Sequence, residues 1–262
     1  MNKRTVHSDA LQYFPDHFSG VSGNYAAFRP SYPEQLFTWL ARITPSTDEA
    51  WDCATGTGQA ALGLARHFRH VTASDASPEQ IVAAAHHPYV TYRVATAEAS
   101  GIADEAVDLV TVAQALHWLD TNRFFDEARR VLRPGGVLAV WAYGTPSMEE
   151  HALNALLQEF YHSEMGPFWP AERKLVDEGY RRILLPFAPV DAPKFGMRVS
   201  WSMEELLGYI RTWSAVSRFV GAKRVDPVST LEKRLSLLWG PGGKRKTVTW
   251  PLTVKASRKQ KQ

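Results

Sequence analysis

The amino-acid sequence predicts an α/β protein in which helices cover both faces of a doubly wound, parallel β-sheet. Between residues 50 and 142, short apolar runs alternate with segments of helical periodicity. The run Val107 to Ala113 is almost continuously apolar, as expected of a strand that is buried on both faces. The chain has 262 residues, of which 45% are hydrophobic and 22% are charged, so it can bury a core without disulfides or a metal. We therefore expect one large domain that carries a smaller subdomain.

The elements are predicted in chain order from the apolar spacing. A helix over Pro33 to Ile43 precedes the first strand. Strands are then expected to end near Cys53 and to cover His70 to Ser74, Val90 to Val94, Val107 to Ala113 and Val137 to Ala142. The helices between them are expected at Ala60 to Phe68, from Ser77-Pro78-Glu79 onward, and from about Arg123 to Leu132, where Arg133-Pro134-Gly135-Gly136 forms a helix-ending turn. Because strand and helix alternate, the crossovers are right-handed and ligands are expected at the carboxyl ends of the strands.

Residues 145 to 240 break this alternation and predict a mainly helical cap over that edge of the sheet. Helices are expected at His151 to His162, Met203 to Arg218 and Pro227 to Leu238, with an extended run around Phe195 to Trp201. The closing stretch, Thr247 to Ala256, alternates like a strand, and Pro251 inside it predicts an edge strand or a bulge.

Composition narrows the classes of partner. The net charge is +3, and residues 241 to 262 hold seven Lys or Arg and no acid. A short basic terminus is more often solvated than bound to phosphates, so a nucleic-acid partner is not expected. The single cysteine, Cys53, allows no intramolecular disulfide, and no stretch has the length of a signal-peptide core or a membrane span. We expect a cytoplasmic protein, a monomer or homodimer, with no membrane partner and no bound metal.

A glycine turn lies between the first strand and its helix, in the segment Trp51 to Gln59. Glycines there let the backbone approach a ligand closely. The letters GTGQAA also fit the relaxed dinucleotide pattern, which alone is weak evidence for NAD. Asp52, just ahead of the turn, suits an ammonium or sulfonium group better than a pyrophosphate. Asp75 ends the second strand and is placed to accept hydrogen bonds from ribose hydroxyls. The balance favours S-adenosylmethionine.

Several motifs agree in order and spacing with one family. They are Tyr25 to Pro33, Asp52 to Gln59, Ser74 to Ser77, Ala97-Glu98, Ala113 to Trp118 and Leu132 to Gly136. Together they resemble the class I S-adenosylmethionine-dependent methyltransferases, specifically the small-molecule group related to trans-aconitate methyltransferase. The resemblance implies a mostly parallel, seven-stranded, Rossmann-like sheet with a C-terminal antiparallel strand. It divides the chain into an N-terminal helical segment (1–45) over the cofactor site, a cofactor-binding core (46–145), a mainly helical cap with one strand (146–240) and a final strand with a basic tail (241–262).

The resemblance also assigns roles to single residues. Tyr25 and Arg29 would fold over the site, with Arg29 pairing with the carboxylate of the cofactor. The residues that would line the cofactor are Asp52, Ala54, Gly56, Gly58, Gln59, Asp75, Ala76, Ser77, Ala97, Glu98, Gln114 and Ala115. Ala54 departs from the family pattern, which usually has glycine there, and an alanine is expected to keep ordinary backbone angles.

Methyl transfer from a sulfonium needs mainly alignment of donor and acceptor, so a catalytic base is optional. His117 is the candidate base, with a packing or substrate-orienting role as its alternative. Trp118, Trp141, Tyr143 and Trp213 are candidate walls of an acceptor pocket, and Trp169 and Trp201 suggest an aromatic lid. The expected function is transfer of a methyl group from S-adenosylmethionine, leaving S-adenosylhomocysteine, to an oxygen of a small organic molecule, with carboxylate favoured by the resemblance. An NAD-dependent oxidoreductase and a noncatalytic S-adenosylmethionine-binding module remain open alternatives.

Overall fold

Five parallel strands form the centre of the sheet. In the computed structural model, which describes residues 29–240 and 243–261, they lie in the order β3-β2-β1-β4-β5. Their bounds are β1 (Glu49–Cys53), β2 (His70–Asp75), β3 (Val90–Val94), β4 (Val107–Ala113) and β5 (Leu132–Tyr143). The chain order reverses between β1 and β4, which are neighbours. Ligands of such sheets bind at this switch point, beyond the carboxyl ends of the strands.

Helices cover both faces of this parallel sheet, as the alternating pattern predicts. On one face, α2 (Glu34–Ile43) and α3 (Gln59–Leu64) pack against each other and the sheet; on the other, α5 (Thr121–Val131) packs against Trp51. The α2–α3 contact depends on Gly63, because a Cβ there would collide with the ring of Phe37. The short helix α4 (Pro78–Val82) begins at Ser77, whose hydroxyl caps the backbone N–H of Gln80, as predicted.

A long C-terminal strand, β9 (Lys246–Arg258), completes the sheet by pairing antiparallel with β5. It also pairs with β6 (Ser147–Met148), β7 (Ala188–Val190) and β8 (Phe195–Trp201), so the described sheet has nine strands where seven were expected. Pro251 lies inside this doubly paired strand and not at an edge. Its carbonyl accepts from Gly144, just past the end of β5, so the missing N–H of the proline faces the gap before β6.

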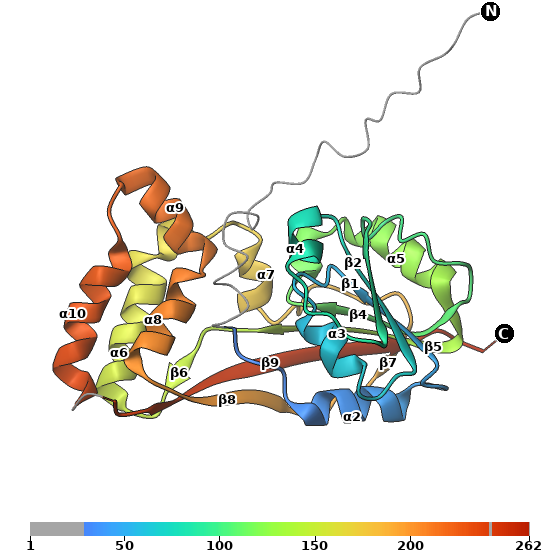
Figure 1. Cartoon of the computed structure of the whole chain (residues 1–262), viewed down its shortest axis with the longest axis horizontal. Helices are drawn as coiled ribbons and strands as arrows, with labels where there is room; N and C mark the ends of the chain where they lie inside the picture. Colours follow the sequence, from blue (N-terminus) through green and yellow to red (C-terminus); the bar gives the residue numbers. More distant parts are fainter. Residues whose placement is uncertain (1–28, 241–242, 262) are drawn as a thin grey trace, which may run out of the picture.

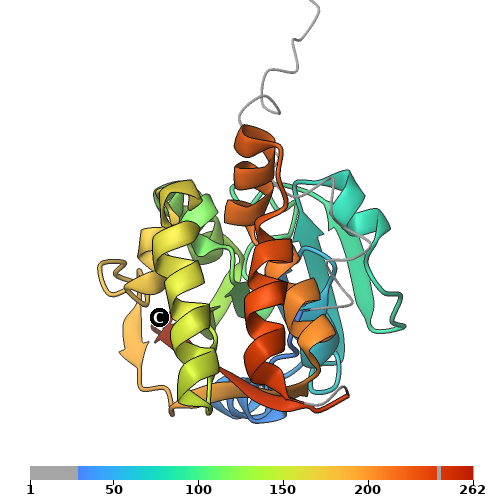
Figure 2. The same cartoon turned by 90° about the vertical axis from the view of Figure 1, so that its left-hand side faces the viewer.

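The cap is a group of helices beside the carboxyl edge of the parallel strands (Figure 1). It contains α6 (His151–Glu159), a π-helical turn (Phe160–Glu164), α8 (Met203–Arg211), α9 (Ser214–Lys223) and α10 (Pro227–Trp239). Figure 2 shows α6 and α10 at the front of the cap. The short helix α7 (Arg173–Asp177) lies between this group and the sheet (Figure 1). Among the described residues, none of the helices has the length and hydropathy needed to cross a membrane.

The helix predicted over Met203 to Arg218 is divided into α8 and α9. Thr212 ends α8 because its hydroxyl hydrogen-bonds the carbonyl oxygen of Tyr209 at 2.6 Å, and Trp213 adopts an extended backbone. A continuous apolar period does not reveal such a break.

The basic residues in β9, and Lys259 just after it, are used within the fold. Lys246 pairs with Glu150 at 2.6 Å. Lys255, Arg258 and Lys259 donate to backbone carbonyls, including that of Leu132 at 2.7 Å from Lys259. Much of the C-terminal basic charge therefore ties β9 to its neighbours.

Candidate functional site

The glycine turn lies at the switch point, between β1 and α3. Gly56 and Gly58 have φ values of 57° and 88°, which side chains rarely allow. A Cβ on Gly58 would also collide with the phenol of Tyr92 on β3. The backbone N–H of Thr55 donates to the carbonyl of Ser74 at 2.9 Å, which joins the turn to β2. The glycines are therefore required by the turn itself.

Ala54 contradicts the expectation of ordinary backbone angles. Its φ is 53°, so an alanine occupies the left-handed region where the family pattern has glycine. Gln114, at the end of β4, has a φ of 57°. Such strain costs about 1–2 kcal/mol per residue and is concentrated at functional sites. The turn thus keeps its shape despite the alanine.

Asp75 connects the turn to the segment after β2. One carboxylate oxygen accepts the backbone N–H of Gly56 at 2.8 Å, and the other accepts that of Ser77 at 2.9 Å. Burial raises the pKa of Asp75, and the hydrogen bonds from Ser77 and Gly56 oppose that shift. A carboxylate fixed in this way still has lone pairs that can accept from ligand hydroxyls.

Asp52 lies beneath the turn and is completely buried. Its two oxygens accept from the hydroxyls of Thr55 (2.5 Å) and Thr111 (2.7 Å), the latter on β4. Burial raises the pKa of Asp52 to about 6, although both hydroxyls oppose the shift. Asp52 therefore supplies negative charge just below the turn, as the preference for a cationic ligand requires.

Gln80 on α4 is a further polar side chain at the turn. It is 6% exposed, and its Oε1 lies 3.7 Å from the position that a Cβ on Gly56 would occupy. Within the part of the chain that the structure describes, this buried Oε1 has no hydrogen-bond partner. A buried carbonyl without a partner beside a ligand turn is a candidate ligand contact.

The remaining predicted cofactor residues follow the same strand ends. Gln114 is held rigidly, because its Oε1 accepts from the backbone N–H of Tyr143 at 2.8 Å and its Nε2 donates to the carbonyl of Tyr143 at 3.2 Å. The other predicted cofactor residues are half-buried or buried near the carboxyl edge of the sheet. They are Gln59, Ala76, Ser77, Ala97, Glu98 and Ala115. Tyr25 lies outside the described residues.

A pocket opens beside this edge, between the sheet, α7 and the cap. The empty space that it spans, including the part open to solvent, is about 560 Å³. The residues that line it are Arg29, Gln114, His117, Trp118, Pro146, Tyr161, Trp169, Pro170, Arg173, Tyr209, Trp213 and Ser214. Its wall is thus aromatic, with two guanidinium groups.

One of these two cations, Arg173, is largely enclosed by the fold. Its side chain is 15% exposed and lies over the rings of Trp169 (5.0 Å) and Tyr161 (5.5 Å). Its Nε donates to the Tyr161 hydroxyl at 2.8 Å and to Asp177 at 3.0 Å. Both hydrogen bonds involve Nε.

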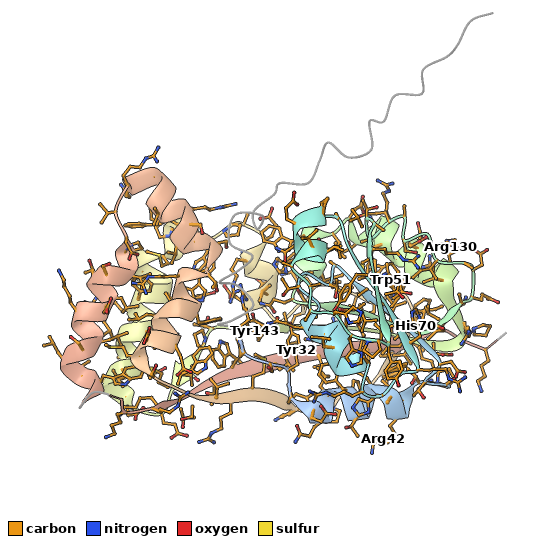
Figure 3. The ribbon with its side chains drawn as sticks, viewed as in Figure 1. Tyr32, Arg42, Trp51, His70, Arg130 and Tyr143 are labelled. Atoms are coloured by element: carbon orange, nitrogen blue, oxygen red, sulfur yellow. The ribbon has the colours of Figure 1, made fainter. Side chains whose placement is uncertain are left out.

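Arg29 enters the pocket from the segment before α2. It donates to the Tyr143 hydroxyl and lies within 6 Å of the rings of Tyr143 and Tyr209. Figure 3 shows Tyr143 beside Tyr32, where the sheet approaches the cap.

The predicted acceptor residues divide into two groups. His117, Trp118 and Trp213 line the pocket, and Trp169 from the predicted lid does so as well. Trp141 and Tyr143 are buried in the core, and Trp201 packs on Tyr209 and Trp250. None of Trp141, Tyr143 and Trp201 is among the lining residues.

His117 is half-buried at the pocket wall, and its Nδ1 is 2.9 Å from the hydroxyl of Tyr180. Burial, together with the positive charge of Arg173, lowers the pKa of His117 to about 3. The imidazole is therefore neutral at pH 7, and its affinity for a proton is lower than a general base requires.

The sequence interpretation missed Arg173, Tyr161, Tyr209, Tyr180 and Gln80. Arg173 belongs to a charged segment with the composition of a solvated helix, and Tyr161 and Tyr209 occupy ordinary positions in predicted helices. Ser77-Pro78-Glu79 did locate the helix start, but only the structure shows that Gln80, in the first turn after it, lies beside Gly56.

Comparison with known proteins gives consistent results. The model of a family described as a methyltransferase domain matches residues 51–140. A protein of Dictyostelium discoideum that is named as a methyltransferase is 31% identical over 225 residues, covering 85% of this chain and 86% of that protein. A protein of Mycobacterium tuberculosis named as an uncharacterized methyltransferase is 39% identical over 126 residues, 47% of this chain; the match spans about half (51%) of that relative.

A similar solved structure is that of a protein from Anaeromyxobacter dehalogenans described as a type II methyltransferase. The TM-score is 0.83 at 40% identity, and the match covers 89% of this chain and 99% of that one. The likeness therefore includes the cap as well as the glycine turn.

Proposed function

Because the chain belongs to the class I S-adenosylmethionine-dependent methyltransferases, we propose that it transfers the methyl group to a carboxylate oxygen of a small organic anion. Membership in this family favours S-adenosylmethionine over NAD at the glycine turn. The identity of the acceptor rests on the pocket described above.

The residues at the switch point fit S-adenosylmethionine. Asp75 and the unpartnered oxygen of Gln80 offer hydrogen-bond acceptors for ribose hydroxyls or an amino group. Asp52 contributes a negative charge that attracts the cationic part of the cofactor. A side chain at Gly56 would meet Gln80 Oε1 alone among the described residues, at 3.7 Å, so the turn is open at that glycine. When bound, the cofactor supplies a methyl group that is already activated by its sulfonium charge. The protein has then to orient the acceptor in line and to exclude water.

The enclosed guanidinium of Arg173 is the observation that supports an anionic acceptor. A planar fork in an aromatic, largely dehydrated pocket binds a carboxylate far better than water-exposed arginine does. Arg29 places a second guanidinium at the same pocket. A carboxylate is ionised at neutral pH, so its oxygen needs no base before it attacks the methyl group.

An acceptor screen with methyl-tritiated S-adenosylmethionine tests the proposal. The purified chain is incubated with a panel of small aliphatic and aromatic carboxylic acids, each beside its own amide. We expect label to enter acids and not amides, as esters that release labelled methanol in alkali. Base-stable label, or transfer to amines, would contradict a carboxylate acceptor, and the absence of transfer to any acceptor would favour a noncatalytic module.

A further inference from the structure

Tyr180 occupies a strained position behind the acceptor pocket. It follows α7 with a φ of 53°, next to Gly179 at 61°, and its side chain is completely buried. Lys255 on β9 holds this segment by donating to the carbonyl oxygens of Tyr180, at 3.1 Å, and Ile183. A left-handed tyrosine persists where the surroundings determine it strongly. The result of this geometry is the contact between the Tyr180 hydroxyl and Nδ1 of His117.

The direction of that hydrogen bond follows from burial. Burial raises the pKa of Tyr180, so the phenol keeps its proton at neutral pH. A buried O–H group must donate, and across residues 29–240 and 243–261 the acceptor within hydrogen-bonding distance of this hydroxyl is Nδ1 of His117. If Nδ1 carried the proton instead, the buried hydroxyl hydrogen would have no acceptor there. Nδ1 is therefore the acceptor, and the proton of the neutral imidazole lies on Nε2.

The Nε2 atom of His117 faces the pocket. In the described chain, Nε2 makes no hydrogen bond to protein. A buried nitrogen without a partner would be counted among the buried unpartnered atoms, and Nε2 is not, so it is open to solvent in the pocket. Arg29 and Arg173 line the same space. Three groups with N–H donors thus surround one small aromatic pocket.

We propose that Tyr180 is a positioning residue that locks His117 in the Nε2–H tautomer, so that His117 donates a hydrogen bond to the anionic acceptor and does not act as a base. The donor role rests on the carboxylate acceptor proposed above, whereas the tautomer lock does not. Because the acceptor is ionised before it binds, a donor at this position stabilises it without removing a proton.

The tautomer lock is tested on the full chain without any ligand. Long-range proton–nitrogen NMR spectra report which imidazole nitrogen is protonated, and the His117 signals are assigned from their absence in His117→Gln. We expect a protonated Nε2 and an unprotonated Nδ1 throughout pH 5 to 8. In Tyr180→Phe, the tautomers should mix, whereas the pKa of the ring should stay low because burial and the charge of Arg173 remain. Tyr92→Phe, which removes a remote phenol, is the control. A protonated Nδ1 in the parent, or the same single tautomer in Tyr180→Phe as in the parent, would overturn the lock.

The donor role is tested with the best carboxylate acceptor of the screen. A glutamine side chain can place its amide N–H near the position of Nε2, whereas an asparagine side chain is too short. We expect His117→Gln to stay within about fivefold of the parent KM and His117→Asn to raise KM about 10- to 100-fold, the effect of losing one hydrogen bond to a charged group. A pH-dependent loss of kcat in both variants would identify a base instead. If the screen finds no carboxylate acceptor, the donor role fails together with the proposed function, while the NMR result on Tyr180 stands independently.

Discussion

The carboxylate of Asp75 accepts the backbone N–H of Gly56 at 2.8 Å, so the end of β2 fixes the turn that follows β1. We predict that Asp75→Ala weakens binding of S-adenosylhomocysteine by about 2–3 kcal/mol, since it removes charge-assisted hydrogen bonds to both turn and ligand. Isothermal titration calorimetry measures the loss. Asp126→Ala, which removes an exposed acid on α5, should bind like the parent. Equal affinities of the Asp75 variant and this control would mean that Asp75 only shapes the turn.

Gln80→Leu should change stability and affinity in opposite directions. Replacing a buried, unpartnered carbonyl by an apolar group of similar size should leave the free energy of unfolding unchanged or raise it. The same change should lower the affinity for S-adenosylhomocysteine, because the ligand loses an acceptor at Gly56. Urea unfolding and calorimetry on one preparation separate the two effects. A variant that keeps full affinity would show that Gln80 has no contact with the cofactor.

Ala54→Gly should be one of the rare alanine-to-glycine changes that does not destabilise. At φ 53°, glycine removes about 1–2 kcal/mol of strain and costs about 0.5–1 kcal/mol of chain entropy, which leaves a gain of up to about 1.5 kcal/mol. Ala128→Gly in the middle of α5 is the matched comparison and should lose at least about 1 kcal/mol. The urea-unfolding midpoints of the two variants test this prediction. Equal losses of stability in both variants would contradict the backbone strain inferred at Ala54.

Asp52 predicts a specific dependence of stability on pH. Its pKa is raised to about 6 in the folded chain, above the ordinary value of 3.8, so the folded state binds the proton more tightly. The stabilisation from the protonated form is complete below pH 3.8 and is lost as the pH rises through 6. Compared with Asp52→Asn, which does not titrate, the parent should lose about 3 kcal/mol of unfolding free energy across this range. Urea denaturation of both proteins at several pH values tests this prediction. A difference in unfolding free energy that does not change with pH would contradict the raised pKa of Asp52.

Arg173→Gln should act on the acceptor and not on the cofactor. Loss of the guanidinium charge should raise KM for a carboxylate acceptor about 10- to 100-fold, whereas the affinity for S-adenosylhomocysteine should stay within twofold. Arg182→Gln, a nearby exposed arginine paired with Glu178, should leave both constants unchanged. Steady-state kinetics and calorimetry give the two readings. A cofactor defect in Arg173→Gln would point to a role in the fold.

Some of the fold could be predicted from the sequence because runs of apolar and β-branched residues mark strands locally, most clearly in β4, which is buried on both faces. The bounds expected for Val90–Val94, Val107–Ala113 and Phe195–Trp201 are those of β3, β4 and β8. The short strands β6 and β7 carry too few residues for any period, and they exist because β9 offers them a partner.

The acceptor pocket was less predictable because its residues come from separate elements. His117 follows β4, Arg173 opens α7, and Trp213 lies in the break between α8 and α9. Arg173 has the composition of a solvated helix until Trp169 and Tyr161 are folded against it. The role of Tyr180 depends on a positive φ, which no residue type other than glycine announces in a sequence.

The long strand β9 has a consequence for how the molecule is made. Its residues 252–258 complete the parallel core against β5, and residues 246–252 complete the cap side against β8. A ribosome synthesises this strand after every element that it joins. Neither half can therefore reach its final structure before this strand is made, and the partners of β9 have to remain without it until Lys246 to Arg258 leave the exit tunnel. Contacts so distant in sequence slow folding. The unpaired strand edges are therefore exposed until β9 pairs with them, and this protein should need protection from aggregation during that time.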